Sequence, residues 1–295
     1  MAGFSIIAKL GLDSSEMQSR IGGLKKKFGD LGDKIGTAVK RGAVVAGAAL
    51  AAWAIDGTKD LMNFKSKMSE VFSLMPGMSQ TAMNAMEADM RKLATTMGVD
   101  LIEATEGLYS AISAGVPPEN AVSFLGEASK TAIAGVAKLG DSVGVLTTVM
   151  DNYKLSTESA GKISDVLFTI VKNGKTTLPE LAANIGKVTP LAASLGIAFE
   201  DVGGMFATLT KALGEGQTPV AATQIKALIA ELGKETGLAA KNFERIAKVS
   251  FTEFIAKGGN VSEALKLMAN DAKANGKSMI DYFGSIEAGQ GAIAL

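Results

Sequence analysis

The stretch Lys172–Glu180, KNGKTTLPE, holds the residues of this chain that most resemble a site for nucleotide chemistry. Within it, Gly174-Lys175-Thr176-Thr177 has the form of the closing half of a phosphate-binding loop. Such a loop places Gly-x-x-x-x-Gly-Lys-Ser/Thr between a strand and a helix, so that consecutive backbone amides surround the phosphates. Whether this stretch can bind a nucleotide therefore depends on the residues around it.

The surrounding residues indicate a turn between two helices. The position that should carry the first glycine of the loop is occupied by Thr169. Upstream, apolar residues recur at the three- and four-residue spacing of a helix: Ile163, Val166, Leu167, Ile170 and Val171. Downstream, Thr177-Leu-Pro-Glu180 has the form of a capping box with proline in the first turn. We expect Gly174 to end one helix, Thr177 to begin the next, and Lys175 to bind no nucleotide.

Other catalytic chemistry is restricted by composition, because the chain has no cysteine and no histidine. Disulfides, the usual zinc sites, Cys-His pairs and Ser-His-Asp triads are excluded. Two acidic pairs remain, Glu200-Asp201 and Glu103 with Glu106, at expected helix starts or on solvated faces, where the helix dipole favours carboxylates. The run Gly214–Pro219 lacks the last glycine of a dinucleotide fingerprint. We expect no enzyme, no catalytic residue, no cofactor and no metal.

The apolar content of the chain predicts an all-α fold. Of its 295 residues 47% are hydrophobic but only 5% are aromatic. Large β-domain cores draw more heavily on aromatic and β-branched residues. Thirty basic and thirty acidic side chains give a formal net charge of zero. No long-range field therefore favours nucleic acid or an acidic membrane, and we expect no sequence-specific nucleic acid binding.

The first 59 residues are expected to form two segments. Alternating apolar residues over 1–12 predict a short strand or arm, which lacks the basic lead and cleavage site of a secretory signal. Over 13–59, a coiled-coil-like helix precedes a hydrophobic helix. The first helix carries a heptad seam: Met17, Ile21, Leu24, Phe28, Leu31 and Ile35. Self-association along this seam and docking on the chain's own domain both fit the pattern.

The hydrophobic segment Gly42–Ile55 is uncharged. Its characteristic residues are Gly42, Val44, Val45, Leu50, Trp53 and Ile55. It is shorter than the roughly 20 residues needed to span a bilayer, and its small residues permit close helix packing. A buried helix and transient membrane insertion, with Arg41 and Trp53 at the interface, both remain open.

Residues 60–295 are expected to form repeated helical hairpins, duplicated at about 60–150 and 151–295. Leu93–Ser113 aligns with Leu191–Thr210: a helix ends at Gly98 or Gly196, an acidic first turn follows, and the next helix carries Tyr109 or Phe206. Prolines mark helix starts at Val116–Glu119 and at Thr218-Pro219, where the threonine can cap the helix.

The 60–295 region resembles the core of phage tail tape measure proteins of the TP901 type. The resemblance rests on several runs, the longest of which extends from VLTTVMDNYKLSTESAGKISDVLFTIV through KNGKTTLPELAANIGKV to GGMFATLTKALGEGQTP. FKSKMSEVFSLM, RKLATTMGVDLIEATEGLYSAISAG and DYFGSIEAGQGAIAL also contribute. Because family members are usually much longer, we expect the chain to be truncated at its C-terminus.

The resemblance implies a structural and assembly role in a phage or prophage tail. Such proteins set tail length inside the tail tube and are ejected to assist genome delivery. The implied partners are further copies of the chain, the tail tube protein, tail assembly chaperones, baseplate or tail-tip proteins, and the host membrane. The implied location is the tail interior, after assembly in the host cytoplasm and before ejection into the envelope. The alternative is a helical protein that perturbs or inserts into the host envelope.

Overall fold

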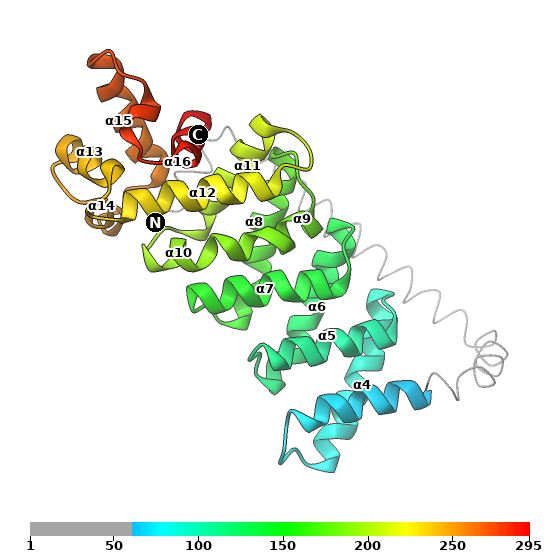
Figure 1. Ribbon diagram of the computed structural model, residues 1–295. Coiled ribbons are helices and arrows are strands. Elements are labelled where there is room, and N and C mark those ends of the chain that lie inside the picture. Colours follow the sequence, from blue (N-terminus) through cyan, green and yellow to red (C-terminus); the bar gives the residue numbers. More distant parts are fainter. Residues whose placement is uncertain (1–60) are drawn as a thin grey trace. The chain divides into compact units, whose positions relative to one another are not determined.

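The computed structural model describes residues 61–295, and every regular element in this part of the chain is a helix (Figure 1). The predicted all-α fold class is therefore confirmed for the described residues. The predicted strand or arm at 1–12, the heptad seam and the hydrophobic segment lie outside them and stay predictions. The chain forms two compact units, which meet in sequence at Val122 and Ser123. The expected duplication within 60–295 also stays a prediction.

The described part of the first unit builds its core from a helix over residues 61–73, α4 (Gln80–Met97) and α5 (Leu101–Ser113). Each helix buries apolar side chains three or four residues apart, the spacing that places them on one face. These are Phe64, Met68 and Val71, then Met86, Met90 and Ala94, then Ala104, Leu108 and Ala111. The Arg91 guanidinium lies 5.1 Å from the centroid of the Phe64 ring, a cation–π contact that joins α4 to the helix before it.

The second unit is built around α12 (Thr218–Gly233), drawn in yellow in Figure 1. This helix contacts α9, α10, α11, α13 and α16. The α-helices are α6 (Pro118–Gly135), which begins in the first unit, α7 (Leu139–Tyr153), α8 (Ala160–Asn173), α9 (Leu178–Asn184), α10 (Thr189–Ser194), α11 (Phe199–Leu213), α12, α13 (Leu238–Ala247), α14 (Phe251–Ala256), α15 (Val261–Ala274) and α16 (Ile286–Ala294). Short 3₁₀ turns lie at η1 (Thr157–Ser159), η2 (Ile185–Lys187) and η3 (Met279–Tyr282).

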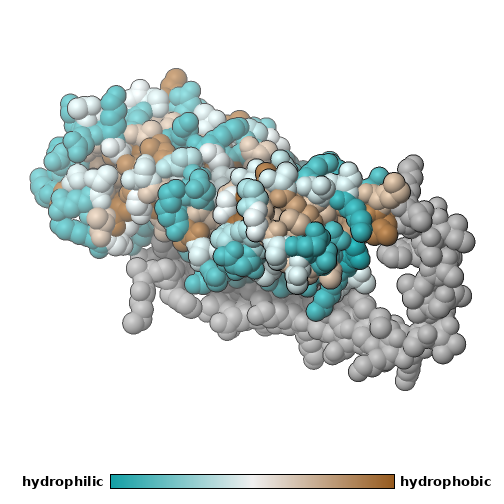
Figure 2. All heavy atoms as spheres, turned by 90° about the horizontal axis from the view of Figure 1, so that it is seen from below, coloured by the Kyte–Doolittle hydropathy of each residue, from teal (hydrophilic) through white to brown (hydrophobic). Residues whose placement is uncertain are grey.

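The outer surface of the described residues mixes polar and apolar side chains. On the face drawn in Figure 2, hydrophilic and hydrophobic residues are interspersed. The most exposed large apolar side chains lie on several helices and turns, with the last two on α16: Met62, Val136, Leu238, Ile286 and Ile293. Single exposed apolar residues are normal on a protein surface, so their exposure alone assigns no site.

The same C-terminal turn recurs along the described helices. Gly98 and Gly196 have φ angles of 67° and 73°. After each of them, the N–H of Val99 or Ile197 donates to the carbonyl five residues earlier. This is the Schellman motif, in which glycine is favoured because a left-handed φ brings it no Cβ clash. The helix ends expected at Gly98 and Gly196 are therefore confirmed.

The aromatic residues of the two aligned segments do not occupy equivalent positions. Phe206 is fully buried in α11, and Leu108 is the fully buried residue at the same distance from its own turn glycine. Tyr109, which the sequence alignment pairs with Phe206, is 40% exposed. Each second helix carries the expected aromatic residue, but the two rings are one position out of register, because the buried face of each helix sets which positions are structurally equivalent.

Both proline positions mark helix starts, as predicted, but the predicted cap at the second one is not formed. α6 begins at Pro118, as the sequence predicts. α12 begins at Thr218 with Gln217 in the cap position, so the expected capping by Thr218 is wrong. Thr218 is fully buried, and its hydroxyl contacts α9 instead. The Thr218 hydroxyl therefore bonds to Glu180 of another helix rather than to the backbone of its own helix.

Candidate functional site

The Gly174–Thr177 segment joins α8 to α9, both helices, so it lacks the strand-to-helix setting of a phosphate loop. Gly174 is the C-cap of α8, as predicted, although its backbone is extended rather than left-handed. Thr177 caps α9: its Oγ1 accepts from the Glu180 amide at 3.3 Å. The Thr177 amide in turn donates to Glu180 Oε2 at 3.3 Å. The predicted capping box is confirmed.

Threonine hydroxyls tie this turn to two further helices. The Lys175 amide donates to Thr210 Oγ1 of α11 at 3.2 Å. Glu180 Oε2 accepts from Thr218 Oγ1 of α12 at 2.9 Å and lies 3.1 Å from Thr176 Oγ1. The Thr176 and Thr218 hydroxyl oxygens are 2.7 Å apart. We call Thr176, Thr177, Glu180, Thr210 and Thr218 the threonine junction; it is a structural joint between α9, α11 and α12.

Gly174 is required at this joint for space rather than for backbone freedom. Its φ of −96° suits any residue. A Cβ atom there would lie 3.2 Å from Ala207 Cα and in collision with Thr210 Oγ1. The absence of a side chain lets the end of α8 approach α11 closely. Packing thus accounts for the Gly-Lys-Thr pattern without a nucleotide, and the exposed Lys175 side chain takes no part in it.

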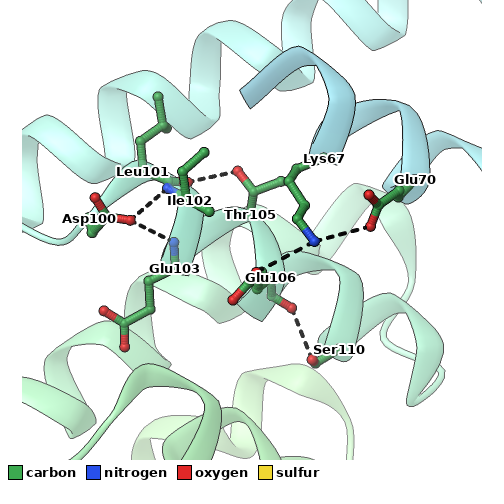
Figure 3. Close-up of polar contacts among 9 residues, drawn as sticks. All are labelled: Lys67, Glu70, Asp100, Leu101, Ile102, Glu103, Thr105, Glu106 and Ser110. Carbon is green, nitrogen blue, oxygen red and sulfur yellow. Dashed lines mark hydrogen bonds and ion pairs between the residues drawn. The ribbon is translucent and has the colours of Figure 1, made fainter. Parts of the chain in front are cut away.

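The acidic pair Glu103 and Glu106 in the first unit is also structural (Figure 3). Glu106 Oε1 pairs with Lys67 Nζ at 3.5 Å, and Lys67 also reaches Glu70 at 3.4 Å. These carboxylates raise the pKa of Lys67 above its ordinary value. Glu103 lies in the first turn of α5, and in Figure 3 its carboxylate points away from Lys67. The two carboxylates therefore do not face a common centre. This agrees with the prediction from the sequence that the pair has a structural role.

The other acidic pair, Glu200 and Asp201, lies in the first turn of α11, where it was predicted. Near this pair lie Tyr153 and the first turn of α15. Burial, the Glu200 carboxylate and the Glu263 carboxylate in the first turn of α15 raise the pKa of Asp201 to about 6. The Tyr153 hydroxyl, buried without a hydrogen-bond partner, has its pKa raised by burial and by Glu200 and Asp201. No sequence signal marks these long-range effects.

We expect Asp201→Asn to stabilise the protein at neutral pH. The folded pKa of Asp201 lies above its unfolded value of 3.8. Its contribution to stability is therefore fully present below about pH 4 and is lost as the pH rises through about 6. Removing the charge should raise the free energy of unfolding at pH 7.5 by about 1–2 kcal/mol. This is less than the pKa shift alone would give, because the asparagine also loses the favourable interaction of a carboxylate with the helix dipole.

Urea unfolding of the wild type and of Asp201→Asn at pH 7.5, 6 and 4 tests this expectation. The difference between the two proteins should shrink as the pH falls. Glu263→Gln is a matched control that removes one of the charges near Asp201. In this background the stability difference caused by Asp201→Asn should still depend on pH, but with a midpoint at lower pH. A difference that stays constant across this pH range would show that Asp201 titrates normally.

Within residues 61–295, no group of three or more acidic side chains is arranged to hold a metal ion. In the same part of the chain, no single helix is long and apolar enough to cross a membrane. α6 and α7 pass that test only as a pair, and they are bent by 118° where they meet. The seam residues and the six residues named in Gly42–Ile55 lie outside the described part, so the structure brings none of them to a site.

Comparison with known proteins identifies the family. The family model for phage-related minor tail proteins matches residues 87–290. The chain belongs to the phage-related minor tail protein family. This match spans both compact units and includes the threonine junction.

A curated relative narrows the similarity to one kind of tail protein. This chain is 32% identical over 271 residues to a probable tape measure protein of Clostridium phage phiCD119. The alignment covers 87% of this chain and 28% of that protein, so the chain spans little more than a quarter of the relative's length. The resemblance to tape measure proteins is thereby confirmed. The comparison with solved structures finds no match.

Proposed function

We propose that this minor tail protein chain is the folded helical core of a tail tape measure protein. The observation that carries the proposal is that the family match coincides with the packed helices of both units. An extended helix adds about 1.5 Å of length per residue, but helices packed side by side do not. The core would therefore serve as an assembly and attachment body, while tail length is set by extended helix elsewhere in the protein.

In this proposal the chain is not an enzyme, because its acidic pairs and its Gly-Lys-Thr turn serve the fold. Its partners are further copies of itself, the tail tube protein, the assembly chaperones and the baseplate or tail-tip proteins. The protein occupies the tail interior, after assembly in the host cytoplasm, and leaves with the genome toward the host envelope. The Met17–Ile35 seam is the proposed contact between copies.

Protease protection in purified particles tests the location. Peptides from 61–295 should be detected by mass spectrometry in phage particles and should resist trypsin while tails are intact. After tails are opened with a chaotrope that is then removed, the lysines of the same region should be cleaved. The major tail tube protein, digested in parallel, is the control for tail integrity. Absence of these peptides from particles, or equal cleavage in intact tails, would contradict the proposed location.

A further inference from the structure

The tripeptide Asn-Gly-Lys occurs twice in this chain, at Asn173–Lys175 and at Asn275–Lys277. Asparagine followed by glycine is prone to spontaneous deamidation, because glycine has no Cβ atom to hinder attack by its backbone nitrogen on the asparagine side chain. Asparagine is accordingly counted among the thermolabile residues of proteins. Because both places carry the same three residues, a difference in their reactivity in the folded protein must come from the structure.

Deamidation needs water as its co-reactant and involves no oxidation. The glycine nitrogen gives its proton to hydroxide and bonds to Cγ of the asparagine. The bond from Cγ to Nδ2 breaks, and the side-chain nitrogen takes a proton from water and leaves as ammonia. Water then opens the five-membered succinimide ring. Cleavage of the new bond gives aspartate, and cleavage of the original peptide bond gives isoaspartate, in which the main chain runs through Cγ.

The folded structure protects the first of the two pairs. The Gly174 amide donates to the Ile170 carbonyl at 2.7 Å, and Asn173 Nδ2 donates to the Thr169 carbonyl at 2.9 Å. Gly174 also lies against α11, where a Cβ atom would be 3.2 Å from Ala207 Cα. The glycine nitrogen can reach Cγ only if the last turn of α8 unwinds and separates from α11. Such opening of a packed helix is a costly local unfolding event.

The second pair lies at an exposed helix end. Asn275 is the C-cap of α15, and both Asn275 and Gly276 are exposed. The Gly276 amide donates to the Lys273 carbonyl at 3.3 Å, a longer bond than the one at Gly174. A Cβ atom on Gly276 would meet nothing within 4 Å, so no part of residues 61–295 packs against it there. Helix ends fray, and this turn can therefore open at a lower cost.

One carboxylate beside Asn275 joins three elements of the second unit. Asp271 of α15 accepts from Arg245 of α13 at 3.2 Å and from the Tyr282 hydroxyl of η3 at 2.7 Å. The Arg245 guanidinium and the Tyr282 hydroxyl lower the pKa of Asp271 to about 2, so this carboxylate is charged at neutral pH. Asn275 Nδ2 donates to the backbone carbonyl of Asp271 at 2.8 Å. The asparagine side chain thus supports the helix turn that holds the joint.

We propose that Asn275 is a site of spontaneous conversion to aspartate and isoaspartate, and that this conversion weakens the joint between α13, α15 and η3. The product replaces a hydrogen-bond donor by a negative charge four residues after Asp271, and like charges at this spacing repel each other. The same charge lies at the C-terminus of α15, where the helix dipole disfavours an anion. This inference goes beyond the proposed tail function and does not depend on it.

Incubation of the full chain in a mildly alkaline buffer tests the assignment of the site. Chymotryptic peptides from successive samples are fragmented in a mass spectrometer, which follows the change from amide to acid at each asparagine. In the folded protein Asn275 should convert at least about tenfold faster than Asn173, because the packed turn opens more rarely. In urea the two sites should convert at comparable rates. Equal rates in the folded protein, or faster conversion at Asn173, would overturn the assignment.

Two variants test the effect on the joint. Asn275→Asp carries the charge of the product, whereas Asn275→Gln keeps a neutral amide whose longer side chain closes a ring far more slowly. Asn275→Asp should melt roughly 2–4 °C below Asn275→Gln, the shift expected for a modest loss of stability in a unit of this size. Added salt should narrow the difference, because it screens both charge effects. Equal melting temperatures, or a difference that salt leaves unchanged, would overturn the proposed weakening of the joint.

Discussion

Gly174→Ala is expected to lower the free energy of unfolding of the second unit by about 2–3 kcal/mol, the upper part of the range for an overpacked site. The new methyl group would meet Thr210 Oγ1 and the backbone of α11 at Ala207. α8 and α11 would have to separate, and the hydrogen bond from the Lys175 amide to Thr210 would lengthen. Thermal unfolding followed by circular dichroism should show a decrease in Tm of roughly 5–10 °C.

Two matched substitutions show whether the effect comes from crowding. Gly161 lies in the first turn of the same helix, and a Cβ there would meet nothing within 4 Å. Gly161→Ala should therefore be neutral or stabilising by up to about 1 kcal/mol. Lys175→Ala removes an exposed side chain and should change stability by no more than about 0.5 kcal/mol.

The same proteins test the nucleotide interpretation of this stretch. Calorimetry with ATP and magnesium should give no binding heat for the wild type or for Lys175→Ala. Wild-type stability in Gly174→Ala would contradict the packing account of the glycine. A binding heat that Lys175→Ala abolishes would restore the phosphate-loop interpretation.

Deletions in a longer relative are expected to show that the packed helices and an extended helical part have different roles. Removing the segment that corresponds to Phe199–Gly233, which holds α11 and α12, would uncover the apolar faces of α8, α9 and α16, all of which pack against these two helices. A packed unit that loses its central helix cannot bury its remaining apolar surface. We therefore expect failure of tail assembly, with few or no tailed particles in electron micrographs.

Deletion of whole heptads from an extended helical part of the same protein should have a different result. Removing seven residues keeps a hydrophobic seam in phase, so the helix still packs along the same stripe. Each heptad removed should shorten the tail by roughly 10 Å. Tails of unchanged length after heptad deletion would refute the ruler role. Proportionately shorter, infectious tails after deletion of α11 and α12 would refute the role of the core as a folded assembly body.

Features whose interacting residues lie within one or two helical turns can be predicted from the sequence. The capping box of Thr177 and Glu180 joins residues three apart, and the helix ends at Gly98 and Gly196 depend on the local preference of glycine for a left-handed φ. The low aromatic content and the three- and four-residue apolar spacing were sufficient to predict an all-α fold, and the same spacing indicated a helix rather than a strand before Gly174. These interactions need no knowledge of which helices become neighbours.

Features that depend on residues far apart in the chain could not be predicted, because they arise from the packing of one helix against another. Thr218 could have capped α12, but its hydroxyl binds Glu180, 38 residues away, because α9 and α12 pack together. The need for glycine at 174 arises only from the close approach of α11, where a Cβ atom would meet Thr210 and Ala207. The raised pKa of Asp201 arises from its burial and from Glu263 on another helix. Burial and electrostatic interactions are set by which helices meet, and local periodicity specifies the faces of helices but not their partners.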